Sequence, residues 1–203
     1  MLVIRTFRSA DLEALYAISL ATGHAGGDAS HLYRDRKLIG HIYSEPYALL
    51  EPGLALVAED DEGVAGFAVG TPDTRKWQER LEAEWWPKLR RQYADPAAWP
   101  AAEWSADQRR ANTIYRPQRT PRQVVDLYPA HLHLNLLERT QGRGAGTMLF
   151  SEWMARASRQ GVGATHVGVN SANARAVRFW SRRGFDRLKL EDAGSGTIWM
   201  GRA

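Results

Sequence analysis

The stretch Gln141-Gly142-Arg143-Gly144-Ala145-Gly146 has the composition of a loop that binds a phosphate group. Glycine lets the backbone approach a ligand closely. A strand pattern before the loop and a helix pattern after it place consecutive amide N–H groups at a helix N-terminus. The loop lacks the lysine-Ser/Thr ending of a P-loop and is too short for the G-x-G-x-x-G dinucleotide motif. Glycines in a turn are usually only structural, but this position between strand and helix predicts a diphosphate site.

Three side chains are candidates for a general base. His133 lies in an alternating stretch with His131 and Asn135 on one face, on the strand that leads into the loop, and an ordinary histidine pKa of about 6.5 suits proton transfer. Asp73, after the third predicted strand, and Asp126, before the fourth, are the carboxylate alternatives. A structural role is the alternative for each, since His133 can be a hydrogen-bonded sheet residue and Asp73 a turn acceptor.

Arginines are concentrated in the part of the sequence that follows His133. From Arg139 to Arg187 there are nine arginines against only Glu152 and Asp186, in a chain with a net charge of +4. A solvated basic face and an anion site both fit this run. No nucleic-acid-binding motif accompanies it, so nucleic acid is not expected as a partner. The chain has no cysteine, which excludes disulfides, thiolate metal sites and an acyl-cysteine intermediate, and no metal site is predicted.

The elements that position these residues alternate between strands and helices. Strand patterns cover residues 2–5, 53–58, 64–69, 131–137 and 165–170, and 185–190 with 197–200 read as a final hairpin. Helices are predicted from Ser9 or Asp11, over 31–39, over 147–160, and over 173–183 ending at Gly184. The sequence therefore predicts an α/β chain, with the glycine loop between the fourth strand and the helix at 147–160.

The composition changes between residues 72 and 126, where five tryptophans lie among charged residues and prolines. Helices are predicted there near 77–93 and 101–115, so we expect one domain over residues 1–203 with a helical insertion at 72–126. The tryptophans are expected to pack the insertion onto the sheet, and a place in a substrate pocket is the alternative. No apolar run approaches the about 20 residues of a membrane span and no signal-peptide pattern is present, so a cytoplasmic location without a membrane partner is expected.

Two segments, in the right order and spacing, resemble motifs of the GNAT acetyltransferases. Residues 136–146 resemble motif A of that family, and residues 173–185 resemble its N-x-x-A-x-x-aromatic-x-x-x-G-F element. Residues 4–11 are also typical of the family, so the resemblance covers nearly the full chain. Residues 66–73, Trp86-Pro87 and residues 128–130 resemble the acetyltransferase-like C-terminal domain of O-GlcNAcase, and the chain looks like a free-standing bacterial relative of that domain.

The resemblance implies the GNAT fold, in which a mixed, mostly antiparallel sheet of about seven strands is flanked by helices and splayed between strands four and five. It also implies acetyl-coenzyme A in this opening, with the pantetheine on the fourth strand and the diphosphate on the amides of residues 142–147. The cofactor-binding residues that it implies are Leu136, Leu137, Glu138, Gln141, Gly142, Arg143, Gly144, Ala145, Gly146, Thr147, Asn173, Ala176, Phe179 and Trp180. Arg143, with Arg175 or Arg182, is the predicted side-chain contact to phosphate.

The reaction implied by the resemblance is direct transfer of an acetyl group to a primary amine of a small molecule or a protein. Trp180 stands where many active members of the family carry the tyrosine that protonates coenzyme A. An indole N–H donates a hydrogen bond but does not readily donate a proton. A non-catalytic acetyl-CoA-binding module is therefore the alternative function. The sequence predicts neither the acceptor nor the oligomeric state.

Overall fold

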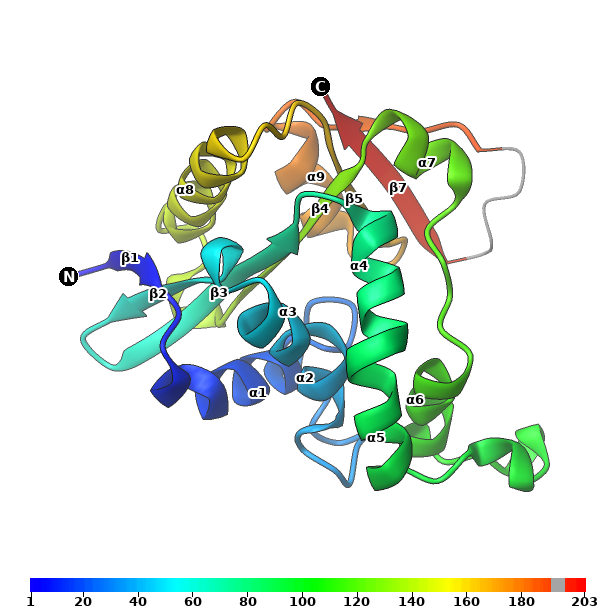
Figure 1. Ribbon diagram of the computed structural model, residues 1–203. Helices are drawn as coiled ribbons and strands as arrows, with labels where there is room; N and C mark the ends of the chain where they lie inside the picture. The colour runs from blue at the N-terminus through cyan, green and yellow to red at the C-terminus, as the bar shows by residue number, and fades with distance from the viewer. Residues whose placement is uncertain (191–195) are drawn as a thin grey trace.

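Seven strands form one sheet in the computed structural model, which describes residues 1–190 and 196–203 (Figure 1). The strands are β1 (Val3–Thr6), β2 (Leu56–Asp60), β3 (Gly63–Thr71), β4 (Ala130–Leu136), β5 (Thr165–Asn170), β6 (Asp186–Arg187) and β7 (Thr197–Arg202). Their order in the described sheet is β1-β2-β3-β4-β5-β7-β6, and every neighbouring pair is antiparallel except β4 with β5. The predicted mixed, mostly antiparallel sheet is confirmed.

The parallel strands β4 and β5 separate soon after they begin. Within the described residues, β4 pairs with β5 only at Ala130 and His131, opposite Thr165 and His166. On its other side, β4 remains paired with β3 as far as Leu136. The predicted opening between strands four and five is therefore confirmed, and it widens toward the carboxyl end of β4.

Backbone groups along β4 point alternately toward its two neighbours. The Leu137 N–H donates to the Ala65 carbonyl on the β3 side at 2.8 Å, and the Ala130 N–H donates to the Ala164 carbonyl on the β5 side at 3.3 Å. After His131, where the pairing with β5 ends, the even-numbered residues of β4 therefore direct their N–H and C=O groups into the opening. These residues are Leu132, Leu134 and Leu136.

Helices cover both faces of the described sheet. They are α1 (Leu12–Ala21), α2 (Leu38–Tyr43), α3 (Glu45–Leu50), α4 (Thr74–Arg80), α5 (Trp86–Gln92), α6 (Ala106–Tyr115), α7 (Arg122–Leu127), α8 (Ala145–Arg159) and α9 (Ala174–Ser181). In Figure 1, α1 to α3 lie on one face of the sheet and α8 and α9 lie on the other. Each face has its own buried core, one around Leu15 and Phe67 and the other around Leu149 and Trp153. No described helix is both long enough and apolar enough to cross a membrane.

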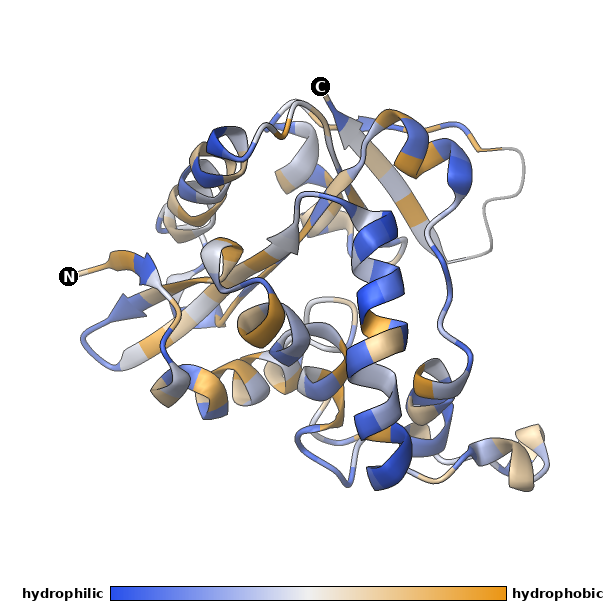
Figure 2. Cartoon of the chain, in the orientation of Figure 1, coloured by the Kyte–Doolittle hydropathy of each residue, from blue (hydrophilic) through white to orange (hydrophobic). Residues whose placement is uncertain are grey.

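Along the sequence, helices α4 to α7 follow β3 and precede β4, at the position where the insertion was expected. Residues 74–92 run as one helix that widens into a π-helical turn at 81–85, directly before Pro87, which has no N–H to continue the ordinary ladder. Figure 2 shows mainly hydrophilic residues along α4 and α5, with a hydrophobic band near this turn. Leu81 of this turn is buried in the cluster that also contains Leu15 of α1 and Leu38 of α2.

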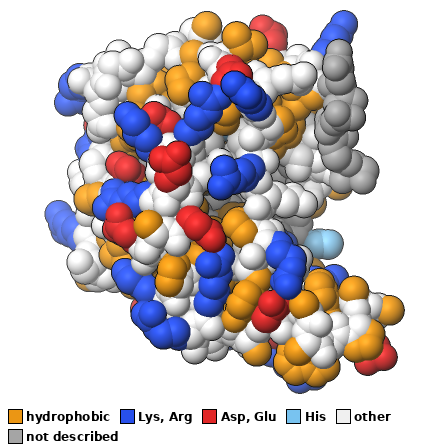
Figure 3. Space-filling model, turned by 45° about the vertical axis from the view of Figure 1, so that its right-hand side comes forward, with side chains coloured by type: hydrophobic (Ala, Val, Ile, Leu, Met, Phe, Trp, Pro, Cys, Tyr) orange, Lys and Arg blue, Asp and Glu red, His pale blue; other side chains and the backbone are white. Residues whose placement is uncertain are grey.

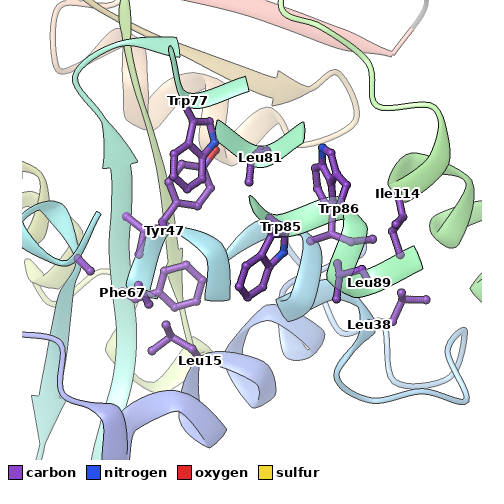
Figure 4. Close-up of a cluster of buried hydrophobic side chains, with 14 of the residues drawn as sticks. Leu15, Leu38, Tyr47, Phe67, Trp77, Leu81, Trp85, Trp86, Leu89 and Ile114 are labelled. Atoms are coloured by element: carbon purple, nitrogen blue, oxygen red, sulfur yellow. The ribbon is translucent and has the colours of Figure 1, made fainter. Parts of the chain in front are cut away.

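The tryptophans of this long helix are core residues. Trp77, Trp85 and Trp86 are 2%, 5% and 4% exposed and point into the cluster that contains Leu15 and Phe67 (Figure 4). The expectation that tryptophans pack the insertion onto the sheet is confirmed for these three. Trp99 differs, because it is 47% exposed on the short turns at 96–103, which project at the lower right of Figures 1 and 3.

The predicted helix at 31–39 is wrong. Residues before Lys37 form turns, because the Asp35 carboxylate accepts the Lys37 N–H at 2.8 Å and so competes with a helical hydrogen bond. The helices of this region are α2 and α3, and α3 begins with Pro46 in its first turn, where proline is tolerated. Helix α7 was not predicted. The other predicted strands and helices are present, with ends shifted by a few residues.

Candidate functional site

A pocket of about 860 Å³ follows the opening between β4 and β5. Residues 132–136 of β4 and 167–170 of β5 form two of its walls. The loop after α1, the glycine loop at residues 141–147 and helix α9 complete most of the lining. The strand divergence thus leaves a space bounded by backbone on two sides.

The glycine loop needs glycine for two separate reasons. Gly142 and Gly144 have φ values of 75° and 86°, and Gly144 is the residue directly before the first turn of α8. A Cβ on Gly146 would lie 2.8 Å from Phe179 Cε2 and 3.2 Å from Leu136 Cδ1, so a larger residue would separate α8 from α9 and β4. The N–H groups of Ala145 and Gly146, in the first turn of α8, have no partner within the helix, whereas the Thr147 N–H donates to the Gly144 carbonyl at 2.9 Å.

Gln141 connects this loop to the far side of the pocket. Its Nε2 donates to the Leu136 carbonyl at 2.9 Å, and its Oε1 accepts from the Arg175 guanidinium. Arg175 also donates to the Gly26 carbonyl at 3.1 Å. Three segments that are distant in sequence are therefore joined at the mouth of the pocket.

Four arginines from α9 and the turn after it line the pocket. They are Arg175, Arg178, Arg182 and Arg183. Among the described residues none of them forms an ion pair with a carboxylate, whereas Arg139 pairs with Asp60 at 2.9 Å and Arg156 with Glu152 at 2.8 Å. The basic run predicted from the sequence thus divides into structural arginines and an unneutralised group beside the glycine loop.

Arg183 was not singled out from the sequence, yet it is the most constrained of the four. Its guanidinium stacks on Phe179 with Cζ 3.4 Å from the ring centre, and it donates to the Thr147 hydroxyl and to the Phe179 carbonyl. Its Nε is buried without a partner among the described residues. Burial, and then the neighbouring Arg182, lower the pKa of Arg183. An anion would relieve both effects.

His133 lines the same pocket and ends a series of hydrogen bonds that runs through Tyr47 and His131 on its own face of β4. The Tyr47 hydroxyl lies 3.2 Å from His133 Nε2 and 2.6 Å from His131 Nε2. His131 Nδ1 lies 2.7 Å from the Thr74 hydroxyl, which donates to the Pro129 carbonyl at 2.6 Å.

The Pro129 carbonyl at the end of this hydrogen-bond series determines which atom donates in each of its hydrogen bonds. Because Thr74 donates its one hydroxyl proton to Pro129, His131 Nδ1 must donate to Thr74, and His131 Nε2 must accept from Tyr47. The Tyr47 oxygen then accepts from His133 Nε2–H. His133 Nδ1 is therefore left as an unprotonated acceptor.

The surroundings keep this histidine neutral. Burial, and then the charge that His166 would carry, lower the pKa of His133 to about 4. Burial, and then the charges that His166 and His133 would carry, also lower the pKa of His131 well below its ordinary value. The sequence prediction used the ordinary value near 6.5, and the structure corrects it because the ring is desolvated against Tyr47 and the sheet.

Comparison with known proteins identifies the family. Residues 126–200 match the family model of the acetyltransferase (GNAT) domain. The crystal structure of SsHAT is similar over 99% of this chain and 97% of that chain, with 34% identity and a TM-score of 0.89. The chain belongs to the GNAT acetyltransferase family. The predicted GNAT fold is thereby confirmed.

Two more distant structures share the GNAT fold. A ribosomal-protein-alanine N-acetyltransferase from Brucella melitensis is 18% identical, with 98% of each chain covered and a TM-score of 0.56. The yncA protein from Salmonella typhimurium, a putative acetyltransferase solved with its cofactor acetyl-CoA, is 16% identical, with 99% of this chain and 92% of that chain covered and a TM-score of 0.55.

Most cofactor residues implied by the GNAT resemblance meet at the pocket. Those that line it are Leu136, Gln141, Gly142, Gly144, Gly146, Thr147, Asn173, Ala176, Phe179 and Trp180. Asn173 also caps α9, accepting the Ala176 N–H at 2.9 Å.

Four of the predicted cofactor residues lie elsewhere. The Leu137 N–H donates to the Ala65 carbonyl of β3 and so is not free for a ligand, and Ala145, the first residue of α8, is fully buried. Arg143 is exposed and Glu138 lies in a short 3-10 turn, and neither lines the pocket. The N–H of Leu137 faces β3 because the strand alternation turns the backbone groups of odd-numbered residues toward that neighbour.

Of the three candidate bases, only His133 lines the pocket. Asp73 is the N-cap of α4 and accepts the N–H groups of Arg75 at 3.0 Å and Lys76 at 3.2 Å. Asp126 forms ion pairs with Arg75 and Arg122 on the surface of α7. Both carboxylates lie toward the end of β4 where it pairs with β5, away from the opening.

Trp180 is both a core residue and a wall of the pocket. It is 6% exposed and packs edge-on against Phe150 and Phe185, with ring centroids 5.8 Å and 5.1 Å away. Thr22, Tyr43 and Arg110 also line the pocket and were not predicted from the sequence. Their positions follow no local pattern, because they come from the end of α1, from α2 and from α6.

Proposed function

We propose that this protein is an acetyl-CoA-dependent N-acetyltransferase that transfers the acetyl group directly to a primary amine. The observation that carries the proposal is that one pocket joins the glycine loop before α8 to His133, a neutral histidine whose Nδ1 has no hydrogen-bond partner among the described residues. The pocket therefore combines a place for a phosphate-bearing cofactor with a place where an amine loses a proton.

Three features of the pocket fit acetyl-CoA. The N–H and C=O groups of Leu134 and the N–H of Leu136 face the opening, where an extended chain of amides, such as pantetheine, finds donors and acceptors. The first amides of α8 suit a diphosphate. The unpaired arginines beside them, including Arg183, suit further phosphate oxygens, because a planar guanidinium binds phosphate through two hydrogen bonds. When bound, acetyl-CoA supplies an activated acetyl group.

The protein itself supplies the base. The hydrogen bonds through Tyr47 hold His133 Nδ1 as an acceptor. The nitrogen of the attacking amine becomes more acidic as it forms its bond to the acetyl carbon. A histidine with a pKa of about 4 takes the proton at that stage, and not from a free ammonium ion. We therefore expect the acceptor to react as the uncharged amine.

Calorimetry with acetyl-CoA, followed by release of free coenzyme A in the presence of amines, tests this function. Because the chain has no cysteine, a thiol reagent reports released coenzyme A alone. Binding followed by amine-dependent release supports the proposal, whereas absence of binding overturns it.

A second candidate is a non-catalytic acetyl-CoA-binding module, and Trp180 is the observation that favours it. A buried indole in place of a tyrosine leaves this helix without a proton donor for the departing thiolate. Tight binding without coenzyme A release from any amine would support this candidate. The cytoplasmic location and the likeness to the O-GlcNAcase domain remain predictions of the sequence.

A further inference from the structure

The side of the pocket opposite the glycine loop carries one more cation, Arg110 of α6. We propose that Arg110, with Tyr33 and Tyr43, binds a carboxylate of the acceptor, so that the substrate is an amine that also bears a carboxylate. This inference rests on the proposed function and names the substrate class for the same pocket.

The two tyrosines hold Arg110 in place and leave part of its hydrogen-bonding capacity unused. Arg110 Nε and Nη2 donate to the Tyr33 hydroxyl at 3.2 and 3.1 Å, and Nη1 donates to the Tyr43 hydroxyl at 2.7 Å. A guanidinium has five N–H groups, so Nη1 and Nη2 each retain one. Each tyrosine oxygen is an acceptor here, so each O–H can still donate. A carboxylate needs such donors.

Arg110 is also partly buried without a counterion. Among the described residues it forms no ion pair with a carboxylate, whereas Arg90 pairs with Glu82 and Arg116 with Asp95 in the same insertion. A cation that loses solvent without a partner is costly. An anionic ligand would supply the missing partner.

The charge of the whole lining favours the same substrate. Five arginines line the pocket, and no aspartate or glutamate of the described residues does so. Four of the arginines belong to the end with the glycine loop, and Arg110 is the fifth. A cationic acceptor would therefore meet only like charges, whereas a carboxylate meets Arg110.

Arg110 lies close enough to the proposed base for one small acceptor to reach both. Arg110 Cζ is 5.3 Å from the Tyr43 ring centre, and the Tyr43 and His133 rings are 6.4 Å apart between centroids. Tyr43, Arg110 and His133 line the same pocket. A carboxylate on Arg110 thus orients the amine toward His133.

Matched acceptors test the proposal. The probes are ω-amino acids from glycine to 5-aminopentanoate, each paired with its primary carboxamide, and kcat/KM is expressed for the unprotonated amine so that basicity cancels. We expect the carboxylate to exceed the carboxamide by about ten- to a hundredfold at the best chain length, the range of a charge-assisted hydrogen bond. Acetylation of both at equal kcat/KM would overturn the carboxylate site and leave the acetyltransferase function standing.

Variants locate the effect. Arg110→Met should bring the carboxylate-to-carboxamide ratio close to one, and Arg110→Lys should restore part of it. Arg109→Met, on the exposed neighbour in the same helix, is the control and should keep the wild-type ratio. An unchanged ratio in a folded Arg110→Met protein would overturn the proposal.

Two further measurements extend the test to peptides and to binding without turnover. Short peptides with an N-terminal acidic residue and an amidated C-terminus distinguish a carboxylate in a protein from one in a free amino acid. If no amine reacts, calorimetry with the N-acetylated ω-amino acids and their amides, in the presence of coenzyme A, measures the site directly. Preference for the acids that Arg110→Met abolishes supports the proposal, and equal binding of both overturns it.

Discussion

The two ends of the pocket share β4 but are made in different ways. The proposed cofactor end, which consists of the glycine loop at 141–147 and the arginines of α9, comes from the C-terminal part of the chain and offers backbone amides and unpaired cations. The proposed acceptor end consists of Tyr43, Arg110 and His133, which come from three distant segments and would act through their side chains.

This difference has a physical consequence for how each end tolerates change. Backbone amides at a helix N-terminus are set by local φ and ψ angles, so strain within the loop is enough to damage the cofactor end. The acceptor end depends on hydrogen bonds that fix protons and rotamers, so the loss of one hydroxyl can change its chemistry while the fold remains. Substitutions at each end test this contrast.

The largest expected effect is the loss of catalysis in the His133→Ala variant. Its kcat/KM should fall by about 10²- to 10⁴-fold, and its affinity for acetyl-CoA should stay unchanged. Since burial lowers the pKa of His133 to about 4, the wild-type rate should lose the contribution of this base only as the pH falls through about 4. Any rise above neutral pH belongs to the acceptor amine and should persist in the variant.

Rates with a saturating amine over pH 4 to 10 check this expectation. His31→Ala, at an exposed histidine outside the pocket lining, is the control. A fall in kcat/KM of less than tenfold would show that His133 is not the base. A change of the rate with pH near 6.5 that is present in the wild type and absent from the variant would show that the His133 ring is not desolvated in solution.

Gly144→Asp should weaken acetyl-CoA binding by about a hundredfold. The substitution forces an L-residue into φ 86° and adds a negative charge beside the diphosphate site. Gly161→Asp is a matched control, because Gly161 has φ 81° at the other end of α8 and is equally open to solvent. The two variants should lose similar stability, and calorimetry should show weak binding only for Gly144→Asp. Equal affinities would separate the cofactor from this loop.

Tyr47→Phe should lower kcat by about tenfold without changing acetyl-CoA affinity. The ring can keep its stacking on Trp77, at 4.2 Å between centroids, but His133 Nε2 loses the acceptor that fixes its tautomer. Tyr115→Phe is the control, since it removes a hydroxyl that donates to the Tyr93 carbonyl outside the pocket lining. Nitrogen NMR of the histidines should show a mixed His133 tautomer only in Tyr47→Phe. A single tautomer in that variant would mean that Tyr47 does not fix the proton.

Acid should destabilise the fold through the histidines behind the acceptor end. Burial lowers the pKa of His133 and His166 to about 4, whereas the unfolded chain binds these protons below about pH 6.5. The unfolded state then holds more protons between about pH 6.5 and 4, so the free energy of unfolding should fall as the pH drops through this range. The expected slope is about 1.4 kcal/mol per pH unit for each histidine.

Urea unfolding at pH 7.5, 6.5 and 5.5 measures this slope. His166→Asn keeps a side-chain donor for the Tyr128 carbonyl and should reduce the slope by the share of one histidine. A slope that does not change in this variant would place the acid sensitivity elsewhere.

The smallest expected effect is on kcat in Trp180→Phe, which should change by less than tenfold if the indole is not a proton source. Because Trp180 is 6% exposed among Phe150 and Phe185, the variant should still lose about 1 to 3 kcal/mol of stability. A hundredfold loss of kcat at unchanged cofactor affinity would show that Trp180 takes part in the chemistry. Trp180→Tyr is the companion variant, and a rise in kcat there would show that a missing acid limits the wild type.

The sequence by itself determined the glycine loop of the proposed cofactor end and most of the sheet. Positive φ values at Gly142 and Gly144, helix spacing that buries Leu149 and Trp153, and strand alternation at 130–136 are all local properties of the chain. Local dihedral preference and hydrophobic periodicity are sufficient to predict such elements. The order of these elements also carried the family resemblance.

Only the tertiary structure decided the acceptor end. The Tyr47 hydroxyl reaches His131 and His133 across more than eighty residues, and the hydroxyl of Tyr43 reaches Arg110 across 67 residues. No local pattern marks such pairs, because a side-chain hydrogen bond between distant segments leaves no periodic signal in either of them. For the same reason the sequence could not choose among His133, Asp73 and Asp126 as the base. The proposal of His133 depends on which end of β4 opens, and hence on where β4 and β5 part.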